Sequence, residues 1–407
     1  MRPLLVLAAL LLPLRLLAEV APEQPGQVDA LPQPPSPHWV WSGDLLLQRT
    51  ALIDTDSGRF LGIVNGGYGT QLAQFARRRP ELYMPATYYS RGTHGTRTDV
   101  VEIYDTEHLA LQGEVVIPAK RATNAVALGH SALSDDDRFL AIFNWTTGTS
   151  LTIVDVLERR FVDEIETPGC SLVYAAGPRR FISICADGAI FTLTLGDDGR
   201  EASRALSKPF FDPKVDPVTE KAVRLGNQWL FVSFAGVIHP IDVGGAEVTL
   251  APTWSLFSDD DRTESWRIGG GQHLAVHAGS GRLYALVHRG GPDRHKEPGE
   301  EVWIYDVAKT ERLARVALVN PGFTIYGFPV TGGQGAIGAL TDWLLDTLAP
   351  PLVGFITVTQ DDQPVLVTAS QFSGSMAIYD ALSGEFLRRV GPTGFTSDVL
   401  QAPWGGS

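Results

Sequence analysis

The histidines that could bind a metal lie in a sequence pattern typical of a β-strand. His273 and His277 are four residues apart in "GGGQHLAVHAGSGRLYALV", a spacing that would place both imidazoles on one face of a helix. The alternating apolar residues around them predict a strand instead. Four residues of a strand span about 13 Å, which is too far for two ligands of one ion. The pair therefore does not indicate a metal site.

Three charged segments are better explained by loops than by catalysis. The acidic run "SDDDR" at 134–138 lacks the ligand spacing of a calcium-binding loop and predicts a solvated hairpin turn. The mixed-sign segment "DRHKEPGEE" at 293–301 is expected at an interface or on the surface. The basic run "ARRRPE" at 76–81 is either a local docking patch or a loop. We assign acid–base chemistry to none of them.

Known catalytic motifs are absent from the sequence. No G-x-S-x-G, H-E-x-x-H, P-loop or C-x-x-C segment occurs. Nine tryptophans are present, and a redox quinone can be made from two crosslinked tryptophans. Such a cofactor requires a small scaffold with many disulfides, so Trp39 and Trp41 are expected to pack at the first strand instead. The residues predict no catalytic residue, metal or cofactor in this chain.

The two cysteines, Cys170 and Cys185, are predicted to form a disulfide. They flank "SLVYAAGPRRFISI", in which Gly177-Pro178 marks a turn between two apolar runs. A hairpin with this turn brings its two ends together, as the short reach of a disulfide requires. Closing a loop of this size stabilises a fold by about 3 kcal/mol. Two free buried thiols are the alternative.

The first residues have the features of an export signal. Arg2 supplies a positive charge, residues 4–12 are apolar, and Ala18 is a plausible cleavage residue. Pro13 and Arg15 shorten the apolar run below the length of a spanning helix; a transmembrane anchor is the alternative. We expect a signal peptide at 1–18, a Pro-rich arm at 19–38 and an exported protein.

The formal net charge of −13 bears on the partners of the chain. Cleavage of the signal peptide would remove Arg2 and Arg15 and make the charge more negative. Such a surface repels nucleic acid and anionic lipid, so neither is an expected partner.

One phrase recurs along the chain and predicts its fold. "VEIYD" from Val101 and "MAIYD" from Met376 are two examples, in which an apolar run ends in Asp before a polar link and a second apolar run. The alternation predicts strands and the link a hairpin, whose Asp carboxylate can accept backbone N–H bonds. The copies end at Asp54, Asp105, Asp155, Asp242, Asp306 and Asp380, and a degenerate copy without the Asp lies near Thr194.

Seven such units, about 40 to 75 residues apart, predict an all-β, seven-bladed β-propeller over 39–407. Another apolar strand pair precedes each hairpin, and packing the four-stranded units in a ring buries both faces of each. An array of β-sandwiches is the alternative. The segment 319–355 breaks the rhythm: "ALTDWLLDTLA" has helical spacing, with Leu340, Leu344 and Leu348 on one side. We expect a short helical insertion near 320–355.

These residues resemble a known family, the heavy subunits of quinoprotein amine dehydrogenases of the methylamine dehydrogenase type. The resemblance extends from about residue 50 to 390 and is carried by "ALIDTDSGRFLGIVNGGYG", "YYSRGTHGTRTDVVEIYD", "TPGCSLVYAAGPRRFISICADGAI", "SWRIGGGQHLAVHAGSGRLYALV", "DRHKEPGEEVWIYD" and "MAIYDALSGEFLRRVG". The combination of "RTDVVEIYD", the two-cysteine hairpin and "RHK" before a blade is the most specific part.

The resemblance implies a periplasmic heterotetramer of two heavy and two light chains. In that family the light chain carries tryptophan tryptophylquinone, which oxidises primary amines to aldehyde and ammonia. The electrons then pass to a cupredoxin such as amicyanin. The heavy chain contributes no redox group; it holds the light chain and shapes the substrate entrance.

The resemblance also implies a role for Tyr68. In the family an aromatic residue after a Gly-Gly pair lines the substrate channel at the subunit boundary, and "NGGYG" places Tyr68 there, where the methylamine enzymes have Phe. An aromatic that packs a blade edge is the alternative. The loop after Tyr68 and the 319–355 segment differ from the methylamine enzymes, which leaves the amine open. A stand-alone periplasmic propeller that binds a ligand or protein without redox chemistry is the second hypothesis.

Overall fold

Residues 31–407 form the compact unit that carries the fold. The chain divides into two units, Met1–Ala30 and Leu31–Ser407. The computed structural model describes residues 30–69, 72–123, 128–322, 324–325, 328–329, 340, 342–344, 347–391 and 393–405. The predicted signal peptide and residues 19–29 of the predicted arm lie outside them.

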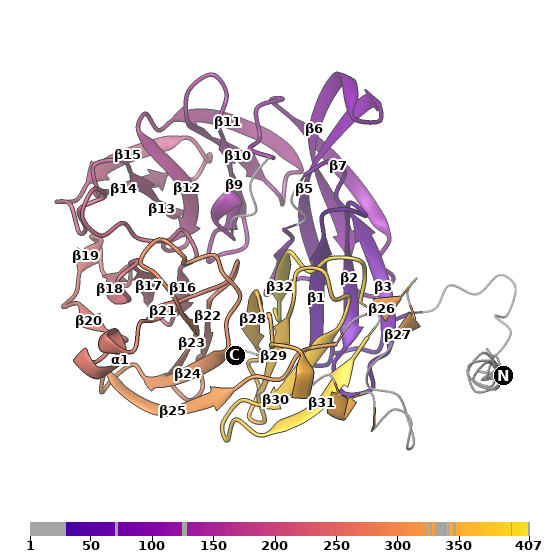
Figure 1. The fold of residues 1–407 in the computed structure, drawn as a ribbon. Coiled ribbons are helices and arrows are strands. Elements are labelled where there is room, and N and C mark those ends of the chain that lie inside the picture. Colours follow the sequence, from indigo (N-terminus) through magenta and orange to yellow (C-terminus); the bar gives the residue numbers. More distant parts are fainter. Residues whose placement is uncertain are drawn as a thin grey trace, which may run out of the picture. The chain divides into compact units, whose positions relative to one another are not determined.

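The strands confirm the predicted seven-bladed β-propeller. Within the described residues, seven antiparallel sheets contain four or five strands each, and they follow one another around a common axis (Figure 1). We number these blades 1 to 7 along the chain and list their strands from the axis outwards. The C-terminal strand belongs to blade 1 with the first three strands of the chain.

The strands of blades 1 to 4 have the following bounds: β32 (Val399–Gln401), β1 (Trp39–Asp44), β2 (Arg49–Asp54), β3 (Phe60–Asn65); β4 (Gln74–Phe75), β5 (Glu81–Arg91), β6 (His94–Asp105), β7 (Leu111–Ile117); β8 (Ser131–Leu133), β9 (Phe139–Asn144), β10 (Ser150–Asp155), β11 (Arg160–Glu166); β12 (Cys170–Ala175), β13 (Arg180–Cys185), β14 (Ile190–Leu195), β15 (Glu201–Leu206).

Those of blades 5 to 7 are β16 (Val223–Leu225), β17 (Gln228–Val232), β18 (Val237–Asp242), β19 (Thr249–Leu250), β20 (Trp254–Ser255); β21 (Trp266–Ile268), β22 (Leu274–His277), β23 (Arg282–Arg289), β24 (Glu301–Asp306), β25 (Glu311–Ala317); β28 (Phe355–Val358), β29 (Val365–Ala369), β30 (Met376–Asp380), β31 (Phe386–Val390). The remaining elements are η2 (Leu128–His130), α1 (Asp259–Thr263), β26 (Thr324–Ile325) and β27 (Phe328–Pro329).

The alternation of strand direction gives the propeller two faces with different connections. One face carries the connections from the inner to the second strand and from the third to the outer strand; we call it the turn face. The other carries the second-to-third connections and the links between blades; we call it the linker face. The repeated Asp turns and Tyr68 therefore belong to opposite faces.

The repeated Asp turns are hairpins between the third and outer strands, as predicted. In five copies the fourth residue after the Asp has a positive φ: Gly58 (74°), Leu109 (54°), Arg159 (49°), Thr310 (56°) and Gly384 (78°). Beside each of these turns the strand pairing shifts by one residue. A left-handed residue that closes a hairpin with a bulge explains why Gly occurs at this position in some copies.

The Asp carboxylates in these turns are structural. In blade 7, Oδ1 of Asp380 accepts hydrogen bonds from the backbone N–H groups of Leu382 (2.9 Å) and Ser383 (2.7 Å). Partial burial raises the pKa of Asp380, but the bonds from Ser383 and Leu382 outweigh it and hold this pKa below its usual value. Asp105 has the same arrangement with Glu107 and His108. The recurrence of Asp therefore needs no catalytic explanation.

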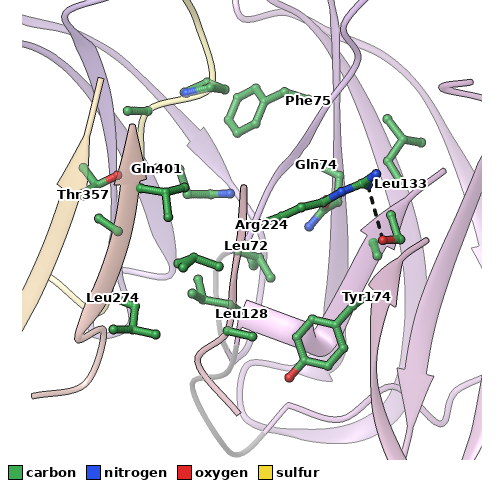
Figure 2. Close-up of a pocket in the computed structure, with 18 of the residues that line it drawn as sticks. Leu72, Gln74, Phe75, Leu128, Leu133, Tyr174, Arg224, Leu274, Thr357 and Gln401 are labelled. Atoms are coloured by element: carbon green, nitrogen blue, oxygen red, sulfur yellow. Dashed lines mark hydrogen bonds between the residues drawn. The ribbon is translucent and has the colours of Figure 1, made fainter. Parts of the chain in front are cut away.

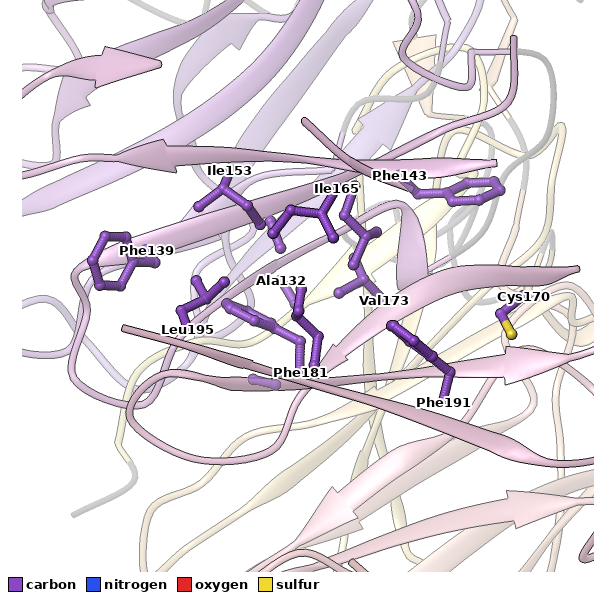
Figure 3. Close-up of a cluster of buried hydrophobic side chains, with 14 of the residues drawn as sticks. Ala132, Phe139, Phe143, Ile153, Ile165, Cys170, Val173, Phe181, Phe191 and Leu195 are labelled. Carbon is purple, nitrogen blue, oxygen red and sulfur yellow. The ribbon is translucent and has the colours of Figure 1, made fainter. Parts of the chain in front are cut away.

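The core consists of layers between neighbouring blades. The layer between blades 3 and 4 packs Phe139 and Ile153 of one sheet with Phe181 and Phe191 of the next (Figure 3). Both faces of a middle strand are covered in this way, and every residue of β10 is buried. Each fully buried large apolar side chain stabilises the fold by about 1.5–3 kcal/mol, so these layers hold the ring together.

The predicted disulfide is present in blade 4. Cys170 on β12 lies directly opposite Cys185 on β13, and the two form a disulfide with a Cα–Cα distance of 3.8 Å. The predicted turn at Gly177-Pro178 connects these two strands. The bond thus ties the inner strand of the blade to its neighbour.

The ring closes through the last strand. β32 pairs with β1, opposite Trp41, Ser42 and Gly43. Two glutamine side chains extend this closure to other blades: Nε2 of Gln272 donates to the carbonyl oxygen of Leu400 (2.8 Å), and Nε2 of Gln401 donates to that of Ala73 (2.8 Å). The first and last residues of the propeller are therefore held in the same sheet.

The predicted insertion contains helical residues. Positions 340, 342–344 and 347–348 are helical, and the other positions between them lie outside the described residues. The predicted leucine stripe faces solvent, since Leu340 and Leu348 are 55% and 76% exposed. The stripe does not pack on the propeller, although its spacing is that of a buried helix face.

The left-handed turn position generates a stability prediction. Gly384→Ala should lower the free energy of unfolding by about 1–2 kcal/mol or more. The backbone at this position has a positive φ, which residues with a side chain disfavour, and an added Cβ would lie 2.5 Å from Cγ2 of Val316. The matched variant Thr310→Gly should leave that free energy unchanged or raise it by up to about 1 kcal/mol. Denaturant titration of both variants measures the two effects, and equal destabilisation would contradict this account.

Candidate functional site on the linker face

Tyr68 lies in the link between blades 1 and 2, in a turn that only glycines permit. Gly67 has φ of 64°, and a Cβ there would lie 2.4 Å from the carbonyl oxygen of Thr87. Gly69 has φ of 100°, and its Cβ would lie 2.7 Å from the carbonyl oxygen of Thr123. The backbone N–H of Tyr68 donates to the carbonyl oxygen of Thr87 at 2.7 Å. The "NGGYG" segment therefore allows this link to lie directly against β5.

The ring of Tyr68 is less constrained than its backbone. The residue is 38% exposed, and its ring packs edge-to-face on Tyr89 with 5.5 Å between centroids. Tyr89 belongs to β5, close to the tip of the β5–β6 hairpin. An aromatic ring on a fixed backbone, open on one side, is suited to contact a small molecule or a partner chain.

A buried carboxylate organises the structure beneath Tyr68. Asp99 is fully buried and accepts two hydrogen bonds from the guanidinium of Arg97, at 2.8 and 2.7 Å. It also accepts the hydroxyl of Thr87 (2.9 Å) and the backbone N–H of Arg121 (2.9 Å). Burying a charged group is unfavourable unless it is paired and hydrogen-bonded, and Asp99 has these partners.

Arg121 connects this network to Tyr68. Its side chain is buried, with Nε donating to the hydroxyl of Thr87 (3.2 Å) and Nη2 donating to the carbonyl oxygen of Tyr68 (3.2 Å). Burial lowers the pKa of Arg121 to about 10 although Asp99 raises it, so the side chain is positively charged at neutral pH. The Tyr68 backbone thus accepts a hydrogen bond from a buried cation.

A nearby acidic residue has an altered pKa but no free oxygen. Glu102 is buried on β6, where its two carboxylate oxygens accept the hydroxyls of Tyr88 (2.6 Å) and Tyr104 (2.9 Å). Burial raises its pKa, and the two tyrosine bonds only partly oppose this. Both oxygens have a tyrosine hydroxyl as donor, so Glu102 holds the positions of these two tyrosines.

Two cavities are lined by residues from several blades. The first has a volume of about 440 Å³ and is lined by residues of the inner strands, including Gln74, Tyr174, Leu274, Thr357 and Gln401 (Figure 2). It is the axial channel, since all seven blades contribute to its wall. Its wall contains both apolar and polar side chains, and those of Gln74 and Gln401 donate to backbone carbonyl groups of neighbouring strands.

The second cavity, of about 850 Å³, opens on the linker face. Its wall includes Phe355, Phe372 and the ion pair of Glu220 with Lys221, whose atoms are 2.6 Å apart. Burial raises the pKa of Glu220, but Lys221 outweighs it and the pKa is lowered, so the carboxylate is charged. Nearby, burial lowers the pKa of His273 to about 3, and Nε2 of this histidine lies 2.9 Å from the hydroxyl of Thr219.

The other candidate side chains from the sequence have structural partners. His277 contacts the hydroxyl of Ser280 (2.8 Å) and the carbonyl oxygen of Asp361 (2.9 Å). Within the described residues, no group of three or more His, Cys, Asp or Glu side chains could hold a metal ion. The acidic segment 134–138 is the β8–β9 turn, and its Asp137 accepts the backbone N–H groups of Arg77 and Arg78 (2.8 and 2.9 Å). This acidic turn therefore binds the basic run at 76–81.

Two of the tryptophans pack against each other in the core. Trp266 and Trp303 have ring centroids 5.2 Å apart, and their indole N–H groups donate to Glu264 (3.1 Å) and Glu301 (2.7 Å). Both rings are buried between blades 5 and 6. This pair stabilises the core and offers no exposed ring for redox chemistry.

The structure places the predicted residues in separate regions. Tyr68 is in the link between blades 1 and 2, whereas the Cys170–Cys185 disulfide is within blade 4. The sequence analysis did not find Asp99, Arg121 or Thr87. The "RTD" segment could have indicated the pair of Arg97 and Asp99, because residues two apart in a strand share one face. No local pattern indicated Arg121, which is 22 residues from Asp99 in the sequence.

The fold defines a class of protein, the seven-bladed β-propellers. Solved structures with 12–15% sequence identity share the fold. They include a protein of unknown function from Desulfotomaculum acetoxidans (TM-score 0.53, covering 89% of this chain and 98% of that one) and a dihydro-heme d1 dehydrogenase (TM-score 0.52, covering 94% and 77%). At this identity the likeness concerns the fold alone.

Sequence comparison shows the family. The family model for the methylamine dehydrogenase heavy chain matches residues 45–335, and this chain belongs to that family. The heavy chain from Methylophilus methylotrophus is 24% identical over 349 residues, covering 86% of this chain and 78% of the relative. That from Paracoccus versutus is 23% identical over 351 residues, covering 86% and 74%.

The described helices bear on the predicted absence of a membrane anchor. None of them is long and apolar enough to cross a membrane. The first 29 residues lie outside the described part of the chain, so the predicted signal peptide stays a prediction.

The network beneath Tyr68 generates a prediction about Arg121. Arg121→Met should lower the free energy of unfolding by about 3 kcal/mol, because it leaves Asp99 with one cation fewer in a buried site. The control Arg204→Met removes a partly exposed ion pair with Glu201 and should change it by less than about 1 kcal/mol. Denaturant titrations compare the two, and a similar small effect in both would show that the network does not stabilise the fold.

Proposed function

We propose that this chain is the heavy subunit of a periplasmic amine dehydrogenase. In this proposal the enzyme oxidatively deaminates a primary amine to an aldehyde and ammonia, and consists of two heavy and two light chains. Tryptophan tryptophylquinone on the separate light chain accepts the two electrons, which a cupredoxin such as amicyanin then takes up. The observation that carries the proposal is the match of residues 45–335 to the heavy-chain family.

The role of this chain in the reaction is to support the light chain and to form the wall of the substrate channel. Tyr68 is proposed to line that channel. Its fixed backbone and half-open ring support this role, because they give a steric boundary of constant position next to Tyr89. The buried groups around it have protein partners, which fits a chain that shapes the entrance while the light chain performs the chemistry.

A second candidate function is a stand-alone periplasmic propeller that binds a ligand. The cavity of about 850 Å³ on the linker face favours it, because its size and mixed wall are those of a small-molecule site. The two candidates differ in whether a light chain is required. If a light chain with a quinone chromophore copurifies with this chain, the dehydrogenase is the correct candidate function.

The proposal predicts where the activity resides. Purified alone, this chain should show no quinone absorbance and no amine-dependent reduction of a dye. Coexpressed with its light chain, it should copurify as a coloured complex that reduces the dye when a primary amine is added. Activity of the isolated chain would contradict the proposal, as would a light chain that is fully active without it.

The proposed channel position predicts an effect of Tyr68 on amine preference. Tyr68→Ala should shift the ratio of kcat/KM between short and long or aromatic amines by roughly ten-fold or more, because one methylene-sized change in a pocket is worth about 1–3 kcal/mol. Tyr68→Phe is the control and keeps the ring. A series of amines on the reconstituted complex measures this ratio. If Tyr68→Ala changes every amine by one factor, Tyr68 does not select the substrate.

A further inference from the structure

Three loops of the linker face present large apolar side chains to solvent. Leu46, in the β1–β2 connection, is 66% exposed, and Leu45 and Leu47 beside it are also exposed. Phe372, in the β29–β30 connection, is 75% exposed, and Phe395, before β32, is 59% exposed. We call these five residues the apolar seat.

Two buried carboxylates hold the loops of the apolar seat together. Asp44 accepts the backbone N–H groups of Leu46 (3.1 Å), Leu47 (3.0 Å) and Phe395 (2.7 Å). Asp398 accepts the backbone N–H of Leu45 at 2.8 Å. Both acidic residues are buried, so their carboxyl groups lie beneath an apolar surface.

The loop that carries Phe372 joins the same arrangement. The side chain of Gln371 donates to Asp398 at 3.4 Å, and the backbone N–H of Ser397 donates to the carbonyl oxygen of Gln371 at 3.1 Å. The three loops therefore form one hydrogen-bonded unit, although they come from opposite ends of the chain.

This combination is characteristic of a prepared docking surface. Burying two carboxylates is unfavourable unless donors surround them, and here the donors are the backbones that carry exposed leucine and phenylalanine. A large apolar group of exposed side chains marks a site of association. Because hydrogen bonds already join the loops, a partner would lose little conformational entropy in binding them.

The apolar seat is continuous with the position of Tyr68. The backbone N–H of Gly66 donates to the carbonyl oxygen of Gln48 at 3.3 Å, which joins the Tyr68 link to the leucine loop. On its other side Tyr68 contacts Tyr89 of the β5–β6 hairpin. The seat, Tyr68 and the hairpin thus form one row across the linker face.

The hairpin forms a raised edge of this row. β5 and β6 pair out to Arg91 and His94, whereas β7 pairs with β6 only as far as Asp99 and β4 with β5 only at Leu82 and Tyr83. The tip therefore extends beyond the rest of its blade (Figure 1). A two-stranded ribbon without neighbours is marginally stable in water, so a partner chain alongside it would stabilise it.

We propose that the apolar seat is the docking surface for the light chain, with Phe372 and Phe395 as its anchors; this inference rests on the proposed function. The seat borders Tyr68, the residue assigned to the boundary between the two chains, and it fits an apolar protein surface. A second copy of this chain is disfavoured as the occupant, because each copy carries a net charge of −13.

The test compares a seat variant with a matched variant on the opposite face. The seat variant is Phe372→Ser with Phe395→Ser. The control is Leu157→Ser with Leu382→Ser, two exposed leucines in Asp turns of the turn face. Each full-length heavy chain is coexpressed with the light chain, and the dissociation constant of the purified chains is measured. Denaturation midpoints check that both variants fold.

The seat variant should bind the light chain at least about 30-fold more weakly, as expected for two hot-spot aromatics, whereas the control should bind like wild type. If wild type binds and the seat variant binds equally well, the seat is not the docking surface and the proposed function stands. If wild type binds no light chain, the proposed function fails. If the seat variant loses only self-association in sedimentation, the seat joins two copies of this chain and the proposal is overturned.

Discussion

The whole propeller depends on the closure of its ring by a three-residue strand. β32 completes blade 1 only after the chain has passed through the other six blades, and it brings the last residues beside Trp41 and Ser42. Blade-to-blade burial stabilises every sheet from both sides, so an open ring would expose two apolar faces at once. Gln272 strengthens the closure by bonding β32 and β28 together, with its amide donating to the carbonyl oxygens of Leu400 (2.8 Å) and Ile356 (3.0 Å). Because β32 is so short, these side-chain bonds are a large part of what holds it.

Closure also determines where the linker face can be organised. Asp44 follows the first tryptophans of the chain, yet its carboxylate accepts the backbone N–H of Phe395, 351 residues away. Asp398 makes the reciprocal connection to Leu45. These bonds exist only once β32 has joined blade 1, so the exposed apolar loops and the closed ring form together. The surface proposed to receive the light chain is therefore a consequence of completed folding rather than of any single blade.

Several charged groups of this protein serve its architecture. Asp380 closes a hairpin, Asp99 anchors Arg97 and Arg121, and Lys221 pairs with Glu220. These groups have protein partners. This distribution is understandable in a family of heavy chains, where the proposed chemistry belongs to a second subunit and this chain supplies position and shape.

The sequence by itself determined the blades, because their signals are local: strands alternate with period two, and in six of the seven units an Asp ends the third strand where the hairpin begins. The Cys170–Cys185 disulfide followed for the same reason, since a single hairpin brings the two residues together. Tyr68 could be selected by its glycine neighbours and by family resemblance, but the network of Asp99 and Arg121 beneath it could not be predicted. Arg121 is 53 residues from Tyr68 and contacts it only because blade 2 folds back onto the link between blades. The exposed leucine stripe of the insertion shows the same limit, since helical spacing indicates which residues share a side and only the surrounding blades decide whether that side is covered.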